Sequence, residues 1–214
     1  MNVSKKERER ALNQNVNCDE GHLGGYVRAS PNPAPSGLHI EHGDPATWNP
    51  RLWQWVYETL NVRSILDVGC GEGHSAGYFR ELGCKVLGID GSVQAKRDSV
   101  IAHAHIIHDY NSGPFIPEGE FDLLWCCEFV EHVAEKYCSH FLATFGCAKN
   151  YIMMTYAPPG QPGWQHVNCQ PKSYWIEKLE TIGFVFYPIL TRVTRHFAES
   201  GHYHNKGLFF VRKD

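Results

Sequence analysis

The amino-acid sequence predicts an α/β fold with a doubly wound sheet, in which strands and helices alternate along 214 residues. Residues 63–68 form a short, apolar, strand-like segment that runs directly into a glycine turn at residues 69–73. A helical pattern follows at once, and a strand, a glycine turn and a helix together begin a nucleotide-binding unit. No internal repeat or linker divides the chain, so one compact α/β unit is expected.

The remaining elements follow from hydrophobic spacing, turn residues and prolines. The first helix is expected because Leu52, Trp53 and Val56 recur at helical intervals. A later helix should open at Pro171 and end at Gly183, since proline suits a first helical turn and glycine suits the residue after a helix. The predicted order is helix 51–60, strand 63–68, helix 75–82, strand 85–89, a helix from residue 91 to about 101, a strand ending at Asp109, strand 121–127, helix 137–147, strand 151–156, helix 171–182, and strands 184–190 and 207–212.

The spacing of the turn glycines separates two classes of ligand. A dinucleotide-binding turn has glycines at its first, third and sixth positions. Here Gly69, Gly71 and Gly73 are followed by His74 at the sixth position, which argues against NAD. Asp67 precedes the turn, where its charge would gain nothing from a phosphate but would favour a ligand that carries an ammonium group.

The run from Asp67 to Gly73, with Asp90 after the next strand, resembles the class I S-adenosylmethionine-dependent methyltransferases. Asp90 stands where a carboxylate accepts both hydroxyls of a ribose. The resemblance covers about residues 51–212 and implies a Rossmann-like, seven-stranded sheet whose last strand is antiparallel. It also implies that Asp109 accepts a hydrogen bond from the adenine amino group. The residues expected to bind the cofactor are Asp67, Gly69, Cys70, Gly71, Gly73, Asp90, Gly91, Asp109, Tyr110 and Glu128.

A second motif follows the predicted fourth strand. Glu128, Glu131 and His132 are spaced to share one face at the start of a helix, and two carboxylates with an imidazole suit a divalent cation. An alternative explanation is the helix dipole, which favours acids at a helix N-terminus. The Glu-x-x-Glu-His pattern resembles the metal-dependent O-methyltransferases of ubiquinone biosynthesis and the 2′-O-methyltransferases that cap small RNAs. The latter take a further ligand from a His in a later loop, which implies His166 here.

The predicted metal ligands are therefore Glu128, Glu131, His132 and His166, with Mg²⁺ expected first and Mn²⁺ or Zn²⁺ as alternatives. A cation that holds two neighbouring hydroxyls would orient the acceptor and lower its pKa, which favours a vicinal diol or catechol. Without a metal, His132 or His166 would act as the catalytic general base, because imidazole titrates near neutral pH.

Residues 1–50 are expected to form an N-terminal arm before a methyltransferase domain of residues 51–214. Residues 1–20 are charged and rich in asparagine, and residues 21–50 are rich in glycine, proline and histidine, but their aromatic and aliphatic side chains are costly to leave in water. We expect the arm to lie over the ligand site as a lid, together with residues 191–205; the competing expectation is that the arm only covers apolar surface. The side chains expected to contact a sugar are Tyr26, His39, His42 and Trp48 of the arm, and Arg195, His196, His202 and His204 of the later segment.

Composition narrows the partners and the location. A net charge of -3 and a pI of about 6.5 argue against nucleic acid as a partner. No apolar run is long enough to span a membrane. Eight cysteines without a CxxC motif or signal peptide indicate free thiols and a cytoplasmic location. A monomer or homodimer is expected.

Together these observations predict an S-adenosylmethionine-dependent O-methyltransferase that acts on a hydroxyl of a small molecule or a glycan sugar. Two alternatives stay open. One is methylation of a ribose hydroxyl of RNA, which the pI disfavours. The other is a cofactor-binding module that has lost turnover, which the acids at every cofactor position disfavour.

Overall fold

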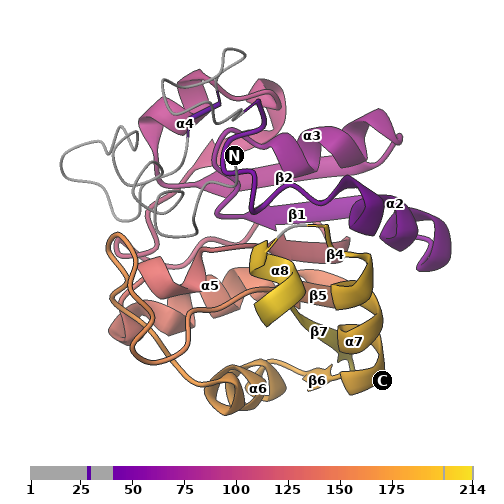
Figure 1. The fold of residues 1–214 in the computed structure, drawn as a ribbon. Helices are drawn as coiled ribbons and strands as arrows, with labels where there is room; N and C mark the ends of the chain where they lie inside the picture. Colours follow the sequence, from indigo (N-terminus) through magenta and orange to yellow (C-terminus); the bar gives the residue numbers. More distant parts are fainter. Residues whose placement is uncertain (1–27, 30–40, 200, 214) are drawn as a thin grey trace, which may run out of the picture.

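A computed structural model of the protein describes residues 28–29, 41–199 and 201–213. A seven-stranded mixed sheet with strand order β3-β2-β1-β4-β5-β7-β6 forms its centre (Figure 1). Strands β1 to β5 pair in parallel, and β7 is antiparallel to both β5 and β6, which confirms the predicted doubly wound sheet with an antiparallel last strand. The strands are β1 (Ser64–Val68), β2 (Lys85–Asp90), β3 (His105–Ile107), β4 (Phe121–Cys126), β5 (Ala148–Met154), β6 (Phe184–Phe186) and β7 (Leu208–Arg212).

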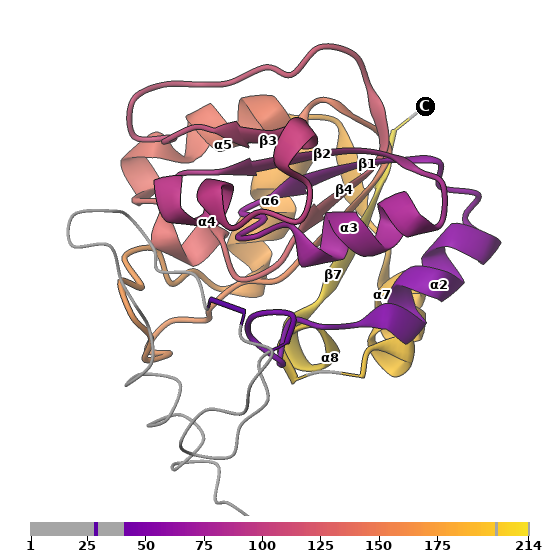
Figure 2. The same ribbon diagram turned by 90° about the horizontal axis from the view of Figure 1, so that it is seen from above.

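Helices cover both faces of the sheet (Figures 1 and 2). On one face, Phe141 of α5 and Trp175 of α6 are fully buried against the strands. On the other face, Trp53 of α2, Phe79 of α3 and Tyr203 of α8 form a second buried cluster. The helices are α2 (Pro50–Thr59), α3 (His74–Glu81), α4 (Val93–Arg97), α5 (Cys138–Phe145), α6 (Lys172–Thr181), α7 (Pro188–Phe197) and α8 (Gly201–Lys206), with 3₁₀ turns η1 (Ala102–Ala104), η2 (Val130–His132) and η3 (Glu135–Tyr137).

Alternation along the central strands separates the two cores. In β1, Ile65 lies in the cluster with α2 and α3, whereas Leu66 lies in the cluster with α5 and α6. In β4, Trp125 lies in the cluster with α2 and α3, and Cys126 lies in the cluster with α5 and α6. Successive strand residues point to opposite faces, so the nearly continuous apolar runs seen in the sequence are those of a sheet buried on both faces.

Several elements are shorter than predicted. The third strand is only His105–Ile107, because the residues before it form the 3₁₀ turn η1. Helix α4 ends at Arg97 rather than near residue 101. The strand predicted at residues 184–190 ends at Phe186, because Pro188 begins α7, where the fixed φ of proline suits the first helical turn.

The predicted order places no helix or strand at residues 191–205, and this is wrong. These residues belong largely to α7 and α8. Helix α7 buries Thr191 and Thr194 and packs against β7. Tyr203 of α8 is fully buried and stacks on Trp125, with the ring centroids 5.1 Å apart. The segment is therefore part of the core as well as part of the strand-end edge.

The cysteines in the described residues are all free, in agreement with the prediction of unpaired thiols. Five of them are buried. In the part of the chain that the structure describes, no helix has the length and apolar character needed to cross a membrane.

Candidate functional site

The glycine turn lies at the carboxyl end of β1, the strand that separates β2 from β4 in the sheet. Gly69, Gly71 and Gly73 have φ values of 75°, 52° and 80°. A Cβ at Gly69 would lie 2.6 Å from the Cβ of Phe129, and a Cβ at Gly73 would lie 2.4 Å from the side chain of Ile101. Both the backbone conformation and the neighbouring side chains therefore require glycine at these two positions.

Asp90 joins the glycine turn to the end of β2. Its Oδ2 accepts a hydrogen bond from the backbone amide of Gly71 at 2.8 Å, and its Oδ1 accepts one from the amide of Ser92 at 2.8 Å. Burial raises the pKa of Asp90, and these hydrogen bonds oppose the shift. Each carboxylate oxygen has a second lone pair, so Asp90 can hold the turn and also accept ribose hydroxyls. Gly91 follows it at the same edge.

Asp67 and Cys70 are buried under the turn. The Asp67 side chain accepts a hydrogen bond from the hydroxyl of Ser75 in α3, and burial raises the pKa of Asp67 to about 7. The Cys70 Sγ atom lies 3.8 Å from Nε2 of His105, and burial raises the pKa of the Cys70 thiol well above its ordinary value. Both side chains therefore support the turn from its buried side.

The two predicted cofactor residues after β3 differ in exposure. Asp109 is exposed, and its Oδ1 accepts hydrogen bonds from the backbone and side-chain amides of Asn111 at 2.8 and 2.6 Å. Tyr110 is buried in the core, where its hydroxyl donates to Oγ1 of Thr144 at 2.9 Å. The structure thus keeps the Asp109 carboxylate at the surface after β3 and turns the Tyr110 hydroxyl inward.

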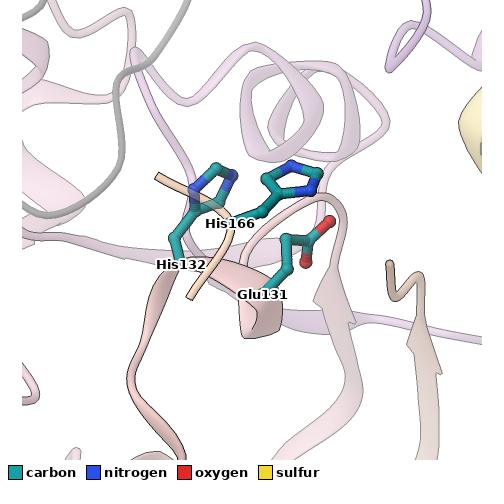
Figure 3. A group of neighbouring side chains, drawn as sticks. All are labelled: Glu131, His132 and His166. Atoms are coloured by element: carbon teal, nitrogen blue, oxygen red, sulfur yellow. The ribbon is translucent and has the colours of Figure 1, made fainter. Parts of the chain in front are cut away.

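Glu131, His132 and His166 converge beyond the carboxyl end of β4 (Figure 3). One ligand atom from each side chain lies within 4.8 Å of the other two. Glu131 and His132 come from η2, and His166 comes from the long loop after β5. The structure therefore brings together three of the four predicted metal ligands from segments that are distant in the sequence.

Backbone hydrogen bonds hold the His166 loop on η2. The amides of Val167 and Asn168 donate to the carbonyl oxygen of Glu131 at 2.9 and 3.1 Å. The Asn168 side chain is buried and donates to the carbonyl oxygen of Val130 at 3.4 Å. Gln165 has a φ of 48°, a conformation that non-glycine residues adopt only when their surroundings impose it. The His166 imidazole is thus placed by the fixed backbone of its loop.

The three converging side chains have unused bonding capacity. Both carboxylate oxygens of Glu131 and the Nδ1 atoms of His132 and His166 are buried without a hydrogen-bond partner among the described residues. Burial, with the charge of Glu128, raises the pKa of Glu131 to about 8, and burial lowers the pKa of His132 to about 4. A buried carboxylate without a partner is costly, and a divalent cation would bind all three groups at once. The residues therefore fit a metal ion.

The structure does not bring Glu128 into this group. No α-helix begins at Glu128, contrary to the expectation from the sequence. Instead Glu128 has a left-handed backbone with a φ of 53°, and the 3₁₀ turn η2 follows. The backbone amide of Glu128 donates to Oγ1 of Thr155 at 2.7 Å, and the same hydroxyl donates to Oε1 of Glu128 at 2.8 Å. One carboxylate and two imidazoles remain in the group, a donor set that suits Zn²⁺, Fe²⁺ or Mn²⁺ better than Mg²⁺.

The second carboxylate oxygen of Glu128 contacts His202, a pairing that the sequence did not predict. Nδ1 of His202 lies 3.2 Å from Oε2 of Glu128, and Nε2 lies 3.0 Å from Oδ2 of Asp44. Burial alone would lower the pKa of His202, but the hydrogen bond to Asp44 and the nearby carboxylates raise it overall. Of the residues predicted to act with His202, Arg195 donates to the carbonyl oxygen of Gly207 at 2.7 Å, and His196 and His204 are exposed.

The described part of the arm contacts both the glycine turn and the core. The amide of Ala29 donates to Oε1 of Glu72 at 3.2 Å. His42 stacks on Trp48, with ring centroids 3.7 Å apart, and Trp48 packs edge-on against buried Trp53 at 5.1 Å. Trp48 thus covers apolar surface, whereas Ala29 contacts the glycine turn. Two of the predicted lid residues lie outside the described residues: Tyr26 and His39.

The unpaired Glu131 carboxyl predicts a pH dependence of stability in the metal-free protein. The folded pKa of about 8 exceeds the ordinary value of 4.5, so the folded protein binds more protons between these values. The free energy of unfolding should therefore fall as pH rises through this interval. Glu131→Gln should make the unfolding free energy depend less steeply on pH. Near the upper end of this pH interval it should raise Tm by several degrees, corresponding to about 1–3 kcal/mol.

Thermal denaturation in chelator at several pH values measures this effect. Asp67, whose pKa is also raised, contributes a slope of the same sign in both proteins, so the difference between wild type and variant isolates Glu131. If the Tm difference between wild type and Glu131→Gln stays constant across this pH interval, burial of the Glu131 carboxyl does not destabilise the protein.

Residues 66–145 match a protein family described as a methyltransferase domain. The chain is 29% identical over 139 residues to a ubiquinone biosynthesis O-methyltransferase from Pseudomonas fluorescens, a match that covers 59% of this chain and 54% of that protein. It is 32% identical over 121 residues to a probable chloroplastic tocopherol O-methyltransferase from Oryza sativa, covering 51% of this chain and 31% of that protein. The matched region thus spans about half the length, or less, of these curated relatives.

A solved structure shares the fold. It is a magnesium protoporphyrin IX methyltransferase from Synechocystis with bound S-adenosylmethionine. The TM-score is 0.55 at 17% sequence identity, and the match covers 76% of each chain. At this identity the likeness concerns the arrangement of strands and helices.

Proposed function

We propose that the protein is an S-adenosylmethionine-dependent methyltransferase that methylates a hydroxyl oxygen of a small-molecule acceptor, as its match to a methyltransferase-domain family supports. The observation that carries the proposal is the meeting of two groups at one edge of the sheet. The glycine turn and Asp90 follow β1 and β2, whereas Glu131, His132 and His166 lie beyond β4 and β5. The two curated relatives are both O-methyltransferases, which supports oxygen as the acceptor atom.

The residues around the glycine turn account for cofactor binding in this proposal. The turn brings the backbone close to the ligand, and Asp90 accepts the ribose hydroxyls from a carboxylate already oriented by Gly71 and Ser92. Asp109, exposed after β3, accepts a hydrogen bond from the adenine amino group. Ligands of open α/β sheets bind at such strand ends, which supports this placement.

Glu131, His132 and His166 would hold one divalent cation in this proposal. When bound, such a cation orients an acceptor hydroxyl and lowers its pKa. The chain itself supplies the fixed placement of the ligands, through the two amides that bind the carbonyl oxygen of Glu131. Zn²⁺, Mn²⁺ or Fe²⁺ suits this set better than the Mg²⁺ predicted from two carboxylates.

The acceptor is proposed to be a diol with an apolar face. Trp164 and Val167 flank His166 and are each 54% exposed. Exposed apolar side chains beside a site favour a ligand with apolar surface. A catechol combines such a surface with two neighbouring hydroxyls, and a sugar of a glycan is the second acceptor class that we propose.

Incubation with labelled S-adenosylmethionine and a panel of catechols, sugars and RNA tests the proposed activity. Label is expected in a low-molecular-weight diol. Label in RNA, at a ribose hydroxyl, would replace the proposal with the RNA-modifying alternative. Cofactor binding without transfer to any acceptor would identify a binding module that has lost turnover.

Asp90→Ala should weaken S-adenosylmethionine binding by roughly 1.5–3 kcal/mol, the range for a hydrogen bond to a charged group. The variant loses the ribose acceptor and also the bond that orients the amide of Gly71. Titration calorimetry measures the S-adenosylmethionine affinity of the wild type and of the variant. Thermal denaturation without ligand shows whether the variant keeps its fold. An unchanged affinity, or binding of NAD by the wild-type protein, would contradict the cofactor assignment.

We further propose that the arm of residues 1–50 is a separate element that covers the cofactor edge of the domain at residues 51–214. The contacts from Ala29 to Glu72 and from Asp44 to His202 support this arrangement. The free cysteines support a cytoplasmic location, where thiols stay reduced.

A further inference from the structure

Glu128 stands at the edge where the cofactor is proposed to bind. It follows β4, which pairs with β1, and its neighbour Phe129 packs directly on Gly69 of the glycine turn. Of the other carboxylates close to the turn, Asp67 is 1% exposed and is bound by Ser75, Asp90 accepts the amides of Gly71 and Ser92, and Glu72 is bound by Ala29 and His74. With Asp90 assigned to the ribose hydroxyls, Glu128 is the acid at this edge that we assign to the ammonium group of a bound S-adenosylmethionine.

The conformation of Glu128 is imposed by its surroundings. A φ of 53° is unfavourable for a glutamate, because its Cβ crowds the backbone. The hydroxyl of Thr155 holds the residue in place. It accepts a hydrogen bond from the Glu128 amide at 2.7 Å and donates one to Oε1 of Glu128 at 2.8 Å. Strained residues of this kind concentrate at functional sites, where the strain sets the direction of a side chain.

His202 holds the second oxygen of the same carboxylate. Its Nδ1 lies 3.2 Å from Oε2 of Glu128, and the side chains are 28% and 15% exposed. We propose that His202 is a positioning residue that directs the Glu128 carboxylate toward the ammonium group of S-adenosylmethionine. This inference rests on the proposed cofactor. It assigns a role in ligand binding to α8, a helix far from the glycine turn in the sequence.

A competing role for His202 is to anchor the arm. Its Nε2 lies 3.0 Å from Oδ2 of Asp44, and its amide donates to the carbonyl oxygen of Ala46 at 3.3 Å. The two side-chain contacts use different ring nitrogens, so they can be separated by substitution. An asparagine amide takes the position of Nδ1 and keeps the Glu128 contact, whereas a glutamine amide takes that of Nε2 and keeps the Asp44 contact.

The experiment measures the affinity of four variants for S-adenosylmethionine by titration calorimetry. His202→Gln should weaken binding about tenfold or more, because no donor then faces Oε2 of Glu128, and His202→Asn should stay close to wild type, because its amide keeps that donor. His204→Asn and His204→Gln are matched controls on the same helix, because His204 is exposed and bonds to the carbonyl oxygen of Arg195. Thermal denaturation without ligand shows whether each variant is folded.

The outcomes separate the two proposals. A wild-type protein that does not bind S-adenosylmethionine contradicts the proposed function. If the wild type binds, equal affinities of the Asn and Gln variants, or a loss in the Asn variant alone, overturn the positioning role. Should the Gln variant fail to fold, His202→Ala replaces it. The inference then requires that the Ala variant loses affinity for S-adenosylmethionine and that the Asn variant keeps it.

Discussion

Removal of divalent metal is expected to slow methyl transfer by about 100-fold or more, since a bound cation contributes several kcal/mol to activation of the acceptor oxygen. Glu131→Gln should give a similar loss even when metal is present, because it removes the charged ligand of the group. The rate would be measured with the acceptor found in the panel, first in chelator and then after adding Zn²⁺, Mn²⁺, Fe²⁺ or Mg²⁺ to separate samples.

Two controls make this result specific to the metal. S-adenosylmethionine affinity should be the same with and without chelator, because the glycine turn and Asp90 do not share ligands with the metal group. Metal binding, followed directly by calorimetry, should be lost in Glu131→Gln independently of any activity. Full activity in excess chelator would instead assign His132 or His166 the role of general base.

Gly163→Ala is expected to weaken metal binding and turnover about as much as His166→Ala. A Cβ at Gly163 would lie 2.1 Å from Nε2 of His166, a distance that forces the imidazole out of its position. The φ of Gly163 lies outside the left-handed region, so the added methyl group acts on the ring and not through backbone strain. Metal affinity by calorimetry and the methyl-transfer rate both report the displacement.

Gly160→Ala is the matched control in the same loop. Gly160 has a φ of 80°, but a Cβ there would meet nothing within 4 Å. Its substitution should cost about 1–2 kcal/mol through backbone strain and lower Tm by a few degrees. Metal affinity should stay unchanged. Equal loss of metal binding in both variants would show that loop strain, and not the collision with His166, controls the site.

The glycine turn and Asp90 could be predicted from the sequence because their geometry is local. Positive φ values require glycine, so Gly69 and Gly73 mark the turn directly. The position of Asp90 follows from the parallel pairing of β1 with β2, the next strand along the chain. The convergence of His166 on Glu131 and His132 was predicted only through the resemblance to metal-dependent enzymes, because the loop that carries His166 has no regular periodicity.

The conformation of Glu128 could not be predicted, because the side chain that stabilises it, Thr155, lies 27 residues later. A glutamate after a strand gives no signal of a left-handed backbone, and the Glu-x-x-Glu-His spacing suggested a helix instead. The contact between Asp44 and His202 joins residues 158 positions apart, and no local pattern marks it.

Helix α7 did have a signal in the sequence. Pro188 stands at its start, and Leu190, Thr194 and Phe197 follow at helical spacing. Tyr187 and Ile189, at the start of the helix, favour strands by intrinsic preference, which explains the prediction of a strand up to residue 190. Burial of Thr194 against the sheet side of the helix decides the outcome, and that packing depends on the whole fold.

The left-handed backbone at Glu128 also limits how far this protein can be stabilised. Glycine or asparagine at this position would relieve strain of about 1–2 kcal/mol, but would remove the carboxylate. Under the role proposed for Glu128, selection for catalysis would retain it, whereas selection for heat resistance would weigh this strain against the carboxylate contacts with Thr155 and His202.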